Sequence, residues 1–381
     1  MTKNKLYILS LGVSLLAFAT TAQAVETKAE NAILMDYETG TYLFTKNHET
    51  MIAPASMSKL MTVYILLHKI KDGEISLEDT FTVSEKAWRK GGAASGGSTM
   101  FLKIGQEVKV EDLLRGILIQ SGNDACIAVA ENISGSEEEF AELMNETAEK
   151  LGLENAHFEN ATGLPHPEHK ISAEDLAKLA RHIIKEFPEY YRIFSEKEFT
   201  FNGIKQGNRN PLLYSLAGAD GLKTGHTDEA GYCLTASAVR GNRRLIEVVA
   251  GLSSNKERSE ESESLMTWGF ANFDNYKFFN KNQIMANIPV WYGAIPSVDL
   301  VVPEDVVVTV KKSTKNKYGA KMNYDTPVKA PIIKGDKLGE LQITYGEKIL
   351  QTIPLVAKED VAKVGTVSRF IANLKYFILG K

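Results

Sequence analysis

Apolar positions recur with two different periods along the chain, and the change between them indicates its organisation. Alternating apolar residues over 32–47, with a turn at Glu38–Thr41, predict a β-hairpin. Segments of helical periodicity fill the middle of the chain, and strand-like segments over 221–252 precede a helix expected at about 256–272. Helices in the middle and strands at both ends predict an α+β fold, in which helices flank an antiparallel sheet and form a helical subdomain.

Capping signals mark where several of the middle helices begin. Ser136 is followed three residues later by Glu139, the pattern of a capping box, and Ser172 stands in the same relation to Asp175. Proline is favoured in the first turn of a helix, so Pro54 predicts another start. In chain order, helices are expected after Pro54, Val110, Ser121, Ser136 and Ser172.

After residue 283 the pattern changes to short runs that are rich in β-branched residues. Residues 298–312 and 339–357 are examples, and turn residues separate them. Such runs predict a small all-β domain of sandwich type over 284–361. This region contains neither His nor Cys, so the chemistry is expected in the preceding domain, over 25–283.

The N-terminus has the pattern of a secretory signal peptide over residues 1–24. Lys3 and Lys5 precede an apolar run, which ends in a small-residue cleavage site at Ala24. The run is shorter than the roughly 20 residues of a membrane-spanning helix. An uncleaved anchor is the alternative interpretation.

The C-terminal residues 362–381 predict an amphipathic helix that attaches the protein to a membrane surface. Its apolar positions fall on one helical face: Val367, Phe370, Ile371, Leu374, Phe377 and Ile378. The charged residues of this segment are all basic, and it is too short to span a bilayer, which suits a helix lying in the interface. A terminal helix docked on its own domain is the alternative.

Length, charge and cysteine content narrow the class of protein. The chain has 381 residues, too many for one simple core, so two domains are expected. Its formal charge of −4 becomes −6 when the signal peptide takes away Lys3 and Lys5, and a mildly acidic chain argues against nucleic acid as a partner. Export would permit a disulfide between Cys126 and Cys233, but each cysteine also fits a small buried position.

A serine and a lysine in the helix expected after Pro54 are candidates for chemistry. Ser56 and Lys59 are three positions apart and share one helical face, whereas Ser58 points away from Ser56. Serine needs a base to become a good nucleophile, and a lysine can be that base if its apolar surroundings lower its pKa. Taken alone, this common pattern would be explained by a helix cap and a lysine that extends to the surface.

Two further motifs change that interpretation. Ser121-Gly122-Asn123 follows an apolar helix, and Lys223-Thr224-Gly225-His226 lies on a predicted strand. In this order, S-x-x-K, S-x-N and K-T-G resemble the penicillin-recognising serine acyltransferases. The surrounding residues, among them "RGILIQSGNDAC" and "GLKTGHTDEAGY", resemble the low-molecular-mass class C penicillin-binding proteins, which are D-alanyl-D-alanine carboxypeptidases of peptidase family S11. The likeness runs from about Ala32 to the C-terminus and implies the penicillin-recognising serine transferase fold.

The resemblance implies roles for individual residues. Ser56 would be the nucleophile that attacks the carbonyl of the penultimate D-alanine, Lys59 its general base, and Ser121 a proton relay. Backbone N–H groups of Ser56 and His226 would form the oxyanion hole. The His226 side chain either takes part in deacylation or is a turn residue without a role. The residues expected to bind the substrate are Asn123, Lys223, Thr224, Gly225, His226 and Arg209.

The resemblance also implies partners and a location. The expected substrates are pentapeptide stems of peptidoglycan, which lose their terminal D-alanine, and β-lactams are expected as acylating inhibitors. The chemistry needs no cofactor. No metal is expected either, although His166 and His169 have a ligand-like spacing. The protein would be exported and attached peripherally to the periplasmic face of the cytoplasmic membrane through its C-terminal helix.

Two other functions stay open at this point. A β-lactamase is one, but class A enzymes have S-D-N where this chain has Gly122, and they need a deacylating glutamate, a role not expected of Glu154 or Glu159. A non-enzymatic envelope scaffold that binds stem peptides is the other. The glycine-rich stretch within residues 88–98 is expected to be a flexible loop that borders the cleft and affects deacylation.

Overall fold

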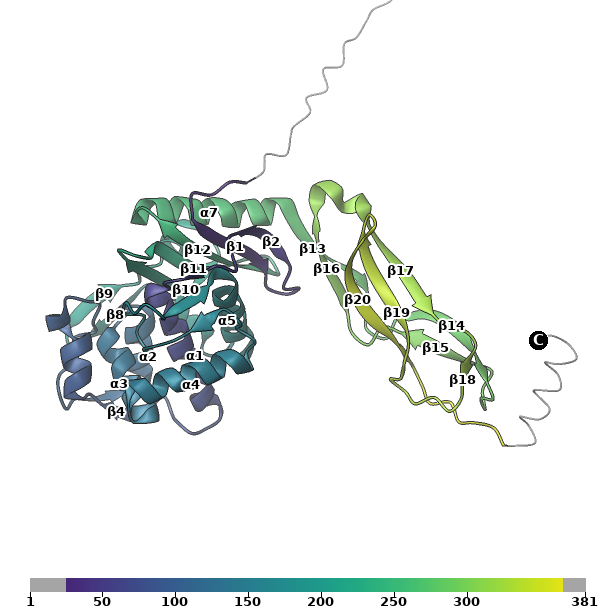
Figure 1. Cartoon of the computed structure of the whole chain (residues 1–381), viewed down its shortest axis with the longest axis horizontal. Coiled ribbons are helices and arrows are strands. Elements are labelled where there is room, and N and C mark those ends of the chain that lie inside the picture. Colours follow the sequence, from purple (N-terminus) through teal and green to yellow (C-terminus); the bar gives the residue numbers. More distant parts are fainter. Residues whose placement is uncertain (1–24, 366–381) are drawn as a thin grey trace, which may run out of the picture.

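The computed structural model describes residues 25–365, which form two bodies joined end to end (Figure 1). The predicted signal peptide and most of the predicted C-terminal helix lie outside these residues. The first body mixes helices and strands and the second consists of strands, which confirms the predicted α+β fold followed by an all-β domain. Throughout residues 25–365, every helix is too short or too polar to cross a membrane.

A five-stranded antiparallel sheet forms the centre of the first body, with the strand order β10-β11-β12-β1-β2. The strands are β1 (Asn31–Asp36), β2 (Tyr42–Lys46), β10 (Ala219–Thr227), β11 (Gly231–Arg240) and β12 (Arg243–Leu252). The hairpin expected at the N-terminus is present as β1 and β2. Because β1 pairs with β12, the beginning and the end of this domain meet in one sheet, and β10 forms its edge.

The sheet separates two hydrophobic cores. Side chains alternate along β12, so that Ile246 and Val248 join the larger core, whereas Leu245 and Val249 join a smaller one. Helix α7 (Asn255–Asn272) lies along the face with the smaller core, and most other helices lie on the opposite face (Figure 1). The arrangement agrees with the predicted sheet between helices.

The helices expected in the middle of the chain are present. They are α1 (Lys59–Lys71), α2 (Val110–Leu118), α3 (Asn123–Ser134), α4 (Glu137–Lys150) and α5 (Ala173–Glu186), and a short α6 (Leu212–Ser215) follows. Both predicted caps form: the Ser136 hydroxyl accepts the Glu139 N–H at 3.1 Å, and the Ser172 hydroxyl accepts the Asp175 N–H at 3.0 Å. The start after Pro54 differs, because one 3₁₀ turn precedes α1.

One short three-stranded sheet and two strand pairs complete the helical region. They are β3 (Met51–Ile52), β6 (Ala156–His157) and β7 (Lys170–Ser172), β4 (Thr80–Thr82) with β5 (Glu107–Lys109), and β8 (Glu198–Phe201) with β9 (Ile204–Gly207). The glycine-rich segment expected to be a loop carries two helical turns, Ala87–Gly91 and Ala93–Ser95. Gly91 packs so closely on the start of α3 that a Cβ there would lie 2.3 Å from the Asp124 nitrogen.

The second body is built from two sheets. One pairs β13 (Phe273–Phe279) with β16 (Val306–Lys311), and the other has the order β17-β19-β20-β15-β14-β18. The remaining strands are β14 (Ile284–Trp291), β15 (Ser297–Val301), β17 (Tyr318–Tyr324), β18 (Val328–Lys329), β19 (Lys337–Tyr345) and β20 (Lys348–Ala357). The domain start predicted at residue 284 stays a prediction, although β13 already packs on the core of this second body.

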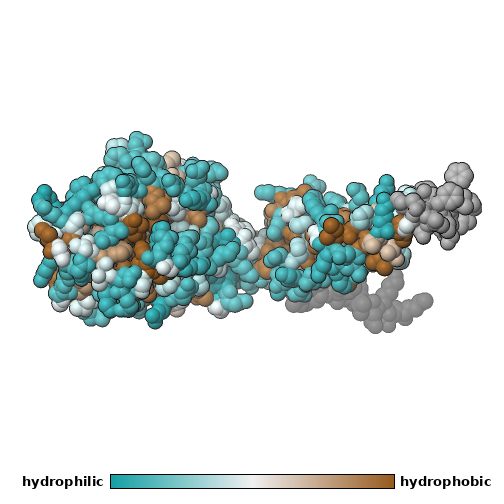
Figure 2. Space-filling view, turned by 90° about the horizontal axis from the view of Figure 1, so that it is seen from below, coloured by the Kyte–Doolittle hydropathy of each residue, from teal (hydrophilic) through white to brown (hydrophobic). Residues whose placement is uncertain are grey.

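The surface of the second body is partly apolar. Hydrophobic side chains reach the surface of both bodies in the view of Figure 2. Those of the second body that are large and exposed are Ile284, Met322, Tyr324, Ile333, Ile349 and Leu350.

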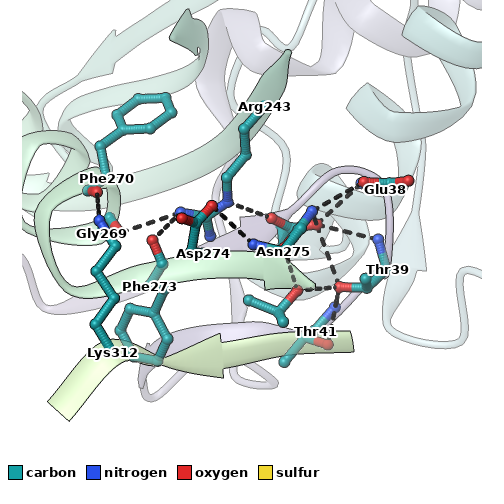
Figure 3. Close-up of polar contacts among 12 residues, drawn as sticks. Glu38, Thr39, Thr41, Arg243, Gly269, Phe270, Phe273, Asp274, Asn275 and Lys312 are labelled. Carbon is teal, nitrogen blue, oxygen red and sulfur yellow. Dashed lines mark hydrogen bonds and ion pairs between the residues drawn. The ribbon is translucent and has the colours of Figure 1, made fainter. Parts of the chain in front are cut away.

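A polar network joins the two bodies where α7 runs into β13 (Figure 3). Arg243 donates from Nε to Asp36 Oδ2 at 2.9 Å and from Nη1 to the Phe273 carbonyl at 2.7 Å. Asn275 Nδ2 donates to Asp36 Oδ1 at 3.0 Å, and Asn275 Oδ1 accepts the Thr309 hydroxyl at 2.8 Å. The side chain of Asp36 is fully buried, so this network satisfies a buried charge and also links the domains.

The two cysteines are free thiols in the first body. Cys126 lies on α3 and Cys233 on β11, and both are buried. Burial raises the pKa of Cys126 to about 12 and that of Cys233 to about 11, so both stay protonated at neutral pH. Their interpretation as small buried residues is confirmed, and the alternative of a disulfide between them is wrong.

Candidate active site

The S-x-x-K residues lie where the chain enters α1 through a 3₁₀ turn, Ala55–Ser58. Ala55 has a φ of 47°, a left-handed conformation that is uncommon for a residue with a side chain, and strained residues of this kind cluster at active sites. Lys59 is one turn beyond Ser56, and its side chain is fully buried. The distance between Lys59 Nζ and Ser56 Oγ is 3.0 Å, so the structure brings this predicted pair together.

A loop that precedes β7 closes over the 3₁₀ turn. Gly163 in this loop has a φ of 77°, and a Cβ there would lie 1.9 Å from the Ala55 carbonyl oxygen. Only glycine can adopt that conformation so close to another backbone segment. The contact places the carbonyl of Thr162 against Lys59, with 2.5 Å between that oxygen and Nζ.

Three oxygen atoms surround Lys59 Nζ: Ser56 Oγ at 3.0 Å, Asn123 Oδ1 at 2.7 Å and the Thr162 carbonyl at 2.5 Å. The two carbonyl oxygens can only accept hydrogen bonds, so they occupy the two N–H groups of a neutral amine. Its lone pair is then left for the Ser56 hydroxyl. Burial lowers the pKa of Lys59 to about 8, which makes the neutral form accessible near physiological pH.

The S-x-N residues connect α2 to α3 opposite this lysine. Ser121 has a φ of 60°, and Gly122 leaves so little room that a Cβ would lie 2.9 Å from Asp124 Oδ1. The buried Asp124 carboxylate accepts the N–H groups of Met100 and Leu102, at 2.9 Å and 3.1 Å. These contacts fix the turn, which brings Asn123 to Lys59 and Ser121 to the K-T-G strand.

The K-T-G residues lie on β10, the edge strand of the sheet. Lys223 is 2% exposed, and its Nζ donates to Ser121 Oγ at 3.0 Å. Burial, and then the positive charges of Lys59 and Arg209, hold the pKa of Lys223 well below its usual range. Gly225 faces the 3₁₀ turn so closely that a Cβ would lie 2.8 Å from the Pro54 carbonyl oxygen.

Two further predicted residues are Arg209, which precedes α6, and His226, which lies near the end of β10. Arg209 donates from Nη1 to Ser98 Oγ at 2.5 Å, and burial lowers the pKa of its guanidinium. His226 is exposed, and its ring centroid lies 4.0 Å from that of Tyr232 on the next strand. The structure thus joins Ser56, Lys59 and Asn123 through Lys59 Nζ, and Ser121 with Lys223. Arg209 contacts Ser98 and the His226 ring contacts Tyr232 instead, so their predicted roles stay predictions.

Sequence analysis missed the loop over 157–169 as part of this site. It supplies the Thr162 carbonyl to Lys59, and its residue His169 contacts the Ser58 hydroxyl with 2.5 Å between His169 Nε2 and Ser58 Oγ. The available signal was the second histidine in "HPEH", which was considered only as a possible metal ligand. A backbone carbonyl such as that of Thr162 leaves no signal in a sequence.

One group of histidine and carboxylate side chains has the spacing of metal ligands. Among the described residues, ligand atoms of His48, Glu49 and Glu174 lie within 4.8 Å of one another. The Glu174 carboxylate there is already 3.0 Å from Lys178 Nζ and accepts the Tyr42 hydroxyl at 2.8 Å. These contacts account for the position of Glu174 without a metal.

Two family models match the chain. The model for the S11 peptidases, described as D-alanyl-D-alanine carboxypeptidase, matches residues 18–254. The model for the C-terminal domain of penicillin-binding protein 5 matches residues 273–363. The first covers the sheet, helices α1 to α6 and the motifs described above, and the second covers the all-β body.

Curated relatives and solved structures agree with both family models. D-alanyl-D-alanine carboxypeptidase DacD of Escherichia coli (strain K12) is 41% identical over 91% of this chain and 90% of its own length. DacA of Haemophilus influenzae is 39% identical over 95% of this chain and 94% of its own length. The crystal structure of penicillin-binding protein 5 from Haemophilus influenzae superposes with a TM-score of 0.84 at 39% identity, over 90% of this chain and 99% of that one.

Fold and site together define a penicillin-binding protein of the carboxypeptidase class. The chain belongs to the peptidase S11 family, the D-alanyl-D-alanine carboxypeptidases, and carries the C-terminal domain of penicillin-binding protein 5. The predicted family is therefore confirmed.

Proposed function

We propose that this D-alanyl-D-alanine carboxypeptidase works through an acyl-enzyme on Ser56. Neutral Lys59 takes the hydroxyl proton of Ser56, and Oγ attacks the carbonyl carbon of the penultimate D-alanine. The bond to the terminal D-alanine then breaks, leaving an ester on Ser56. The observation that carries this proposal is the position of Lys59 Nζ, 3.0 Å from Ser56 Oγ, with carbonyl oxygens at its other two contacts.

Proton transfer to the leaving amine completes the first half of the reaction. The Ser121 hydroxyl, 3.0 Å from Lys223 Nζ, donates its proton to the amine nitrogen as the C–N bond breaks. The proton held by Lys59 replaces it. In the second half, Lys59 takes a proton from water, the resulting hydroxide attacks the ester carbonyl, and Ser56 leaves with a proton as the peptide acid is released.

Substrate binding is assigned to β10, to Arg209 and to Asn123 of the S-x-N turn. The N–H groups of Ser56 and His226 stabilise the oxyanion of the tetrahedral intermediate. Thr224 and Lys223 on β10, with Arg209 beside them, bind the terminal carboxylate, and Asn123 holds the substrate backbone. The small Gly225 permits close approach of β10 to the 3₁₀ turn. The substrates are peptidoglycan stem peptides, and β-lactams acylate the same serine.

The location is part of the same proposal. Residues 1–24 direct export, and residues 362–381 attach the protein to the periplasmic face of the cytoplasmic membrane. The support lies in the apolar run and cleavage site of the first segment and in the one-sided apolar pattern of the second. The second body then lies between the attached segment and the catalytic domain.

Labelling with a fluorescent penicillin tests the nucleophile. Wild type is expected to form a stable fluorescent adduct, and Ser56→Ala is expected to form none, while circular dichroism shows both to be folded. Hydrolysis of a peptide that ends in D-Ala-D-Ala should disappear in the same variant. A fully labelled Ser56→Ala protein would show that another residue is the nucleophile.

A further inference from the structure

His169 is a buried histidine outside the three motifs, and it bridges the two backbone segments that meet at Lys59. One of these segments is the 3₁₀ turn that carries Ser56, and the other is the loop over 157–169. His169 is 2% exposed, and Ser58 is fully buried. The ring nitrogen Nε2 lies 2.5 Å from Ser58 Oγ, and Nδ1 accepts the backbone N–H of Glu159 at 3.0 Å.

These two contacts determine the protonation state of the ring. A backbone N–H always donates, so Nδ1 must carry a lone pair, and the proton of the neutral ring must lie on Nε2. The Nε2–H group therefore donates to the Ser58 hydroxyl. Burial lowers the pKa of His169 to about 4, so the ring stays neutral over the whole range in which Lys59 titrates.

Charged and titratable groups near His169 act on its pKa in opposite directions: Glu159 raises it, whereas the other groups, His157, His166 and Lys59, lower it. The carboxylate of Glu159 accepts from His157 at 2.8 Å and lies 3.8 Å from His166. The ammonium form of Lys59 disfavours a second positive charge on His169. Consequently His169 has no role as an acid or base in this arrangement, and what it supplies is geometry.

The geometry matters because the loop delivers an oxygen to Lys59. The Thr162 carbonyl is 2.5 Å from Lys59 Nζ, and the neighbouring Ala161 carbonyl accepts the Thr62 hydroxyl of α1 at 2.7 Å. Asn160 Oδ1 holds the following turn by accepting the N–H groups of Thr162 and Gly163, at 3.1 Å and 2.8 Å. His169 ties the beginning of this loop, at Glu159, to the residue next to Lys59.

We propose that His169 is a positioning residue that, through Ser58 and Glu159, keeps the Thr162 carbonyl on Lys59 and so directs the lysine lone pair at Ser56. This inference rests on the proposed roles of Ser56 and Lys59. An apolar side chain of similar size would fill the space but would leave the Ser58 hydroxyl and the Glu159 N–H without these partners. The loop could then move away from α1, and water could reach Lys59.

Two substitutions of His169 distinguish its contact with Ser58 from its contact with Glu159. The amide of His169→Asn occupies the place of Nδ1 and can keep the bond to Glu159, whereas the amide of His169→Gln reaches the place of Nε2 and can keep the bond to Ser58. Both variants are expected to acylate with penicillin at least about tenfold more slowly than wild type, because small displacements of a catalytic group reduce rates strongly. Peptide KM is expected to change little and kcat to fall.

The pH dependence of penicillin acylation distinguishes a positioning role of His169 from a role in stability alone. Burial is the main cause of the low pKa of Lys59, so a displaced loop should let that pKa rise toward its ordinary value. The acid limb of the acylation profile is therefore expected to move to higher pH in both variants. Ser58→Ala removes the hydroxyl that accepts from His169, and it is expected to shift the acid limb in the same direction. Its combination with His169→Gln should add little further, and circular dichroism checks that each variant is folded.

His166→Gln is the matched control, since His166 belongs to the same loop but is exposed. It is expected to keep the wild-type rate and profile. Wild-type rates and profiles in His169→Asn, His169→Gln and Ser58→Ala would overturn the inference, and so would rate losses that match the unfolded fraction without a shifted profile. Ser56→Ala is labelled in parallel: an adduct there would refute the proposed nucleophile, whereas its absence beside normal His169 variants would refute the positioning role alone.

Discussion

At the scale of single residues, the site depends on two amines that are kept in a buried place. Lys59 and Lys223 are both almost completely buried, and both have a lowered pKa, but their contacts differ. Carbonyl oxygens of Asn123 and Thr162 orient Lys59, whereas the Ser121 hydroxyl contacts Lys223. The first arrangement suits a base and the second suits a proton relay beside a carboxylate-binding group.

The pH dependence of acylation follows from the pKa of Lys59. A lysine acts as a base only when it is neutral, and the pKa of about 8 means that the neutral fraction grows as the pH rises through that value. We expect the second-order rate of penicillin acylation to increase roughly tenfold per pH unit below about 8 and to level off above it. The measurement is fluorescent labelling at a series of pH values, with circular dichroism as the control for folding. A rate that is constant below pH 8 would contradict the assignment of Lys59 as the base.

At the scale of elements, the sequence predicted what depends on periodicity and caps. The helices begun by Ser136 and Ser172 could be placed because a capping box lies within four consecutive residues, and the strands could be placed because side chains alternate. The pairing of Ser56 with Lys59 was predictable for the same reason, since it is local.

What could not be predicted is contact between segments far apart in the chain. The approach of the Thr162 carbonyl to Lys59 depends on Gly163 passing the Ala55 carbonyl, and no local pattern encodes that contact. The helical turns in the segment after Ala87 were missed because glycines suggest irregular chain, whereas here Gly91 permits close packing on α3.

Gly91 and Gly96 give a test of that packing. A Cβ at Gly91 would lie 2.3 Å from the Asp124 nitrogen, so Gly91→Ala must displace either this segment or the start of α3, which carries Asn123. We expect penicillin acylation to slow by about tenfold or more and unfolding stability to fall by about 1–3 kcal/mol, as for other overpacked sites. Rates of labelling and of adduct loss are measured together with urea denaturation.

Gly96→Ala is the control for that substitution. Gly96 lies in the same segment with a φ of 73°, but nothing lies within 4 Å of its added Cβ. Gly96→Ala should lower the free energy of unfolding by about 1 kcal/mol, because alanine is strained at this positive φ. Its acylation rate should stay near that of wild type. If Gly91→Ala acylates and deacylates like Gly96→Ala, the segment does not support the position of Asn123.

At the scale of the whole molecule, the candidate active site and the domain junction use different strands of one sheet. The active site uses β10, an edge strand, whereas Asp36 and Arg243 of the junction lie on β1 and β12 in the interior of the sheet. Asn275 at the start of the second body contacts Asp36, and Thr309 contacts Thr39 with 2.6 Å between their hydroxyl oxygens (Figure 3). We therefore expect that the orientation of the second body can change while the active-site residues keep their positions.

Removal of the Asn275 side chain should change the orientation of the second body without changing the activity of the first. Asn275→Ala loses the hydrogen bonds to Asp36, Glu38 and Thr309, while Arg243 still pairs with Asp36. We expect the distribution of distances between the two bodies to broaden and stability to fall by about 1–2 kcal/mol. Hydrolysis of a soluble D-Ala-D-Ala peptide should stay within about twofold of wild type, because residues that are far apart and share no contacts usually act independently.

Spin labels provide the distance measurement. Glu142→Cys on α4 and Lys321→Cys on β17 introduce exposed attachment points, one on each body, whereas the two native cysteines are buried. Lys277→Ala serves as the control, since it removes only an exposed pair between Lys277 and Asp305 within the second body. It should leave the distance distribution unchanged. If the distance distribution for Asn275→Ala is as narrow as that of the control, α7 and the Arg243 contacts alone fix the orientation of the second body. If Asn275→Ala instead loses most of its peptide hydrolysis, the domain junction and the active site are coupled through the sheet.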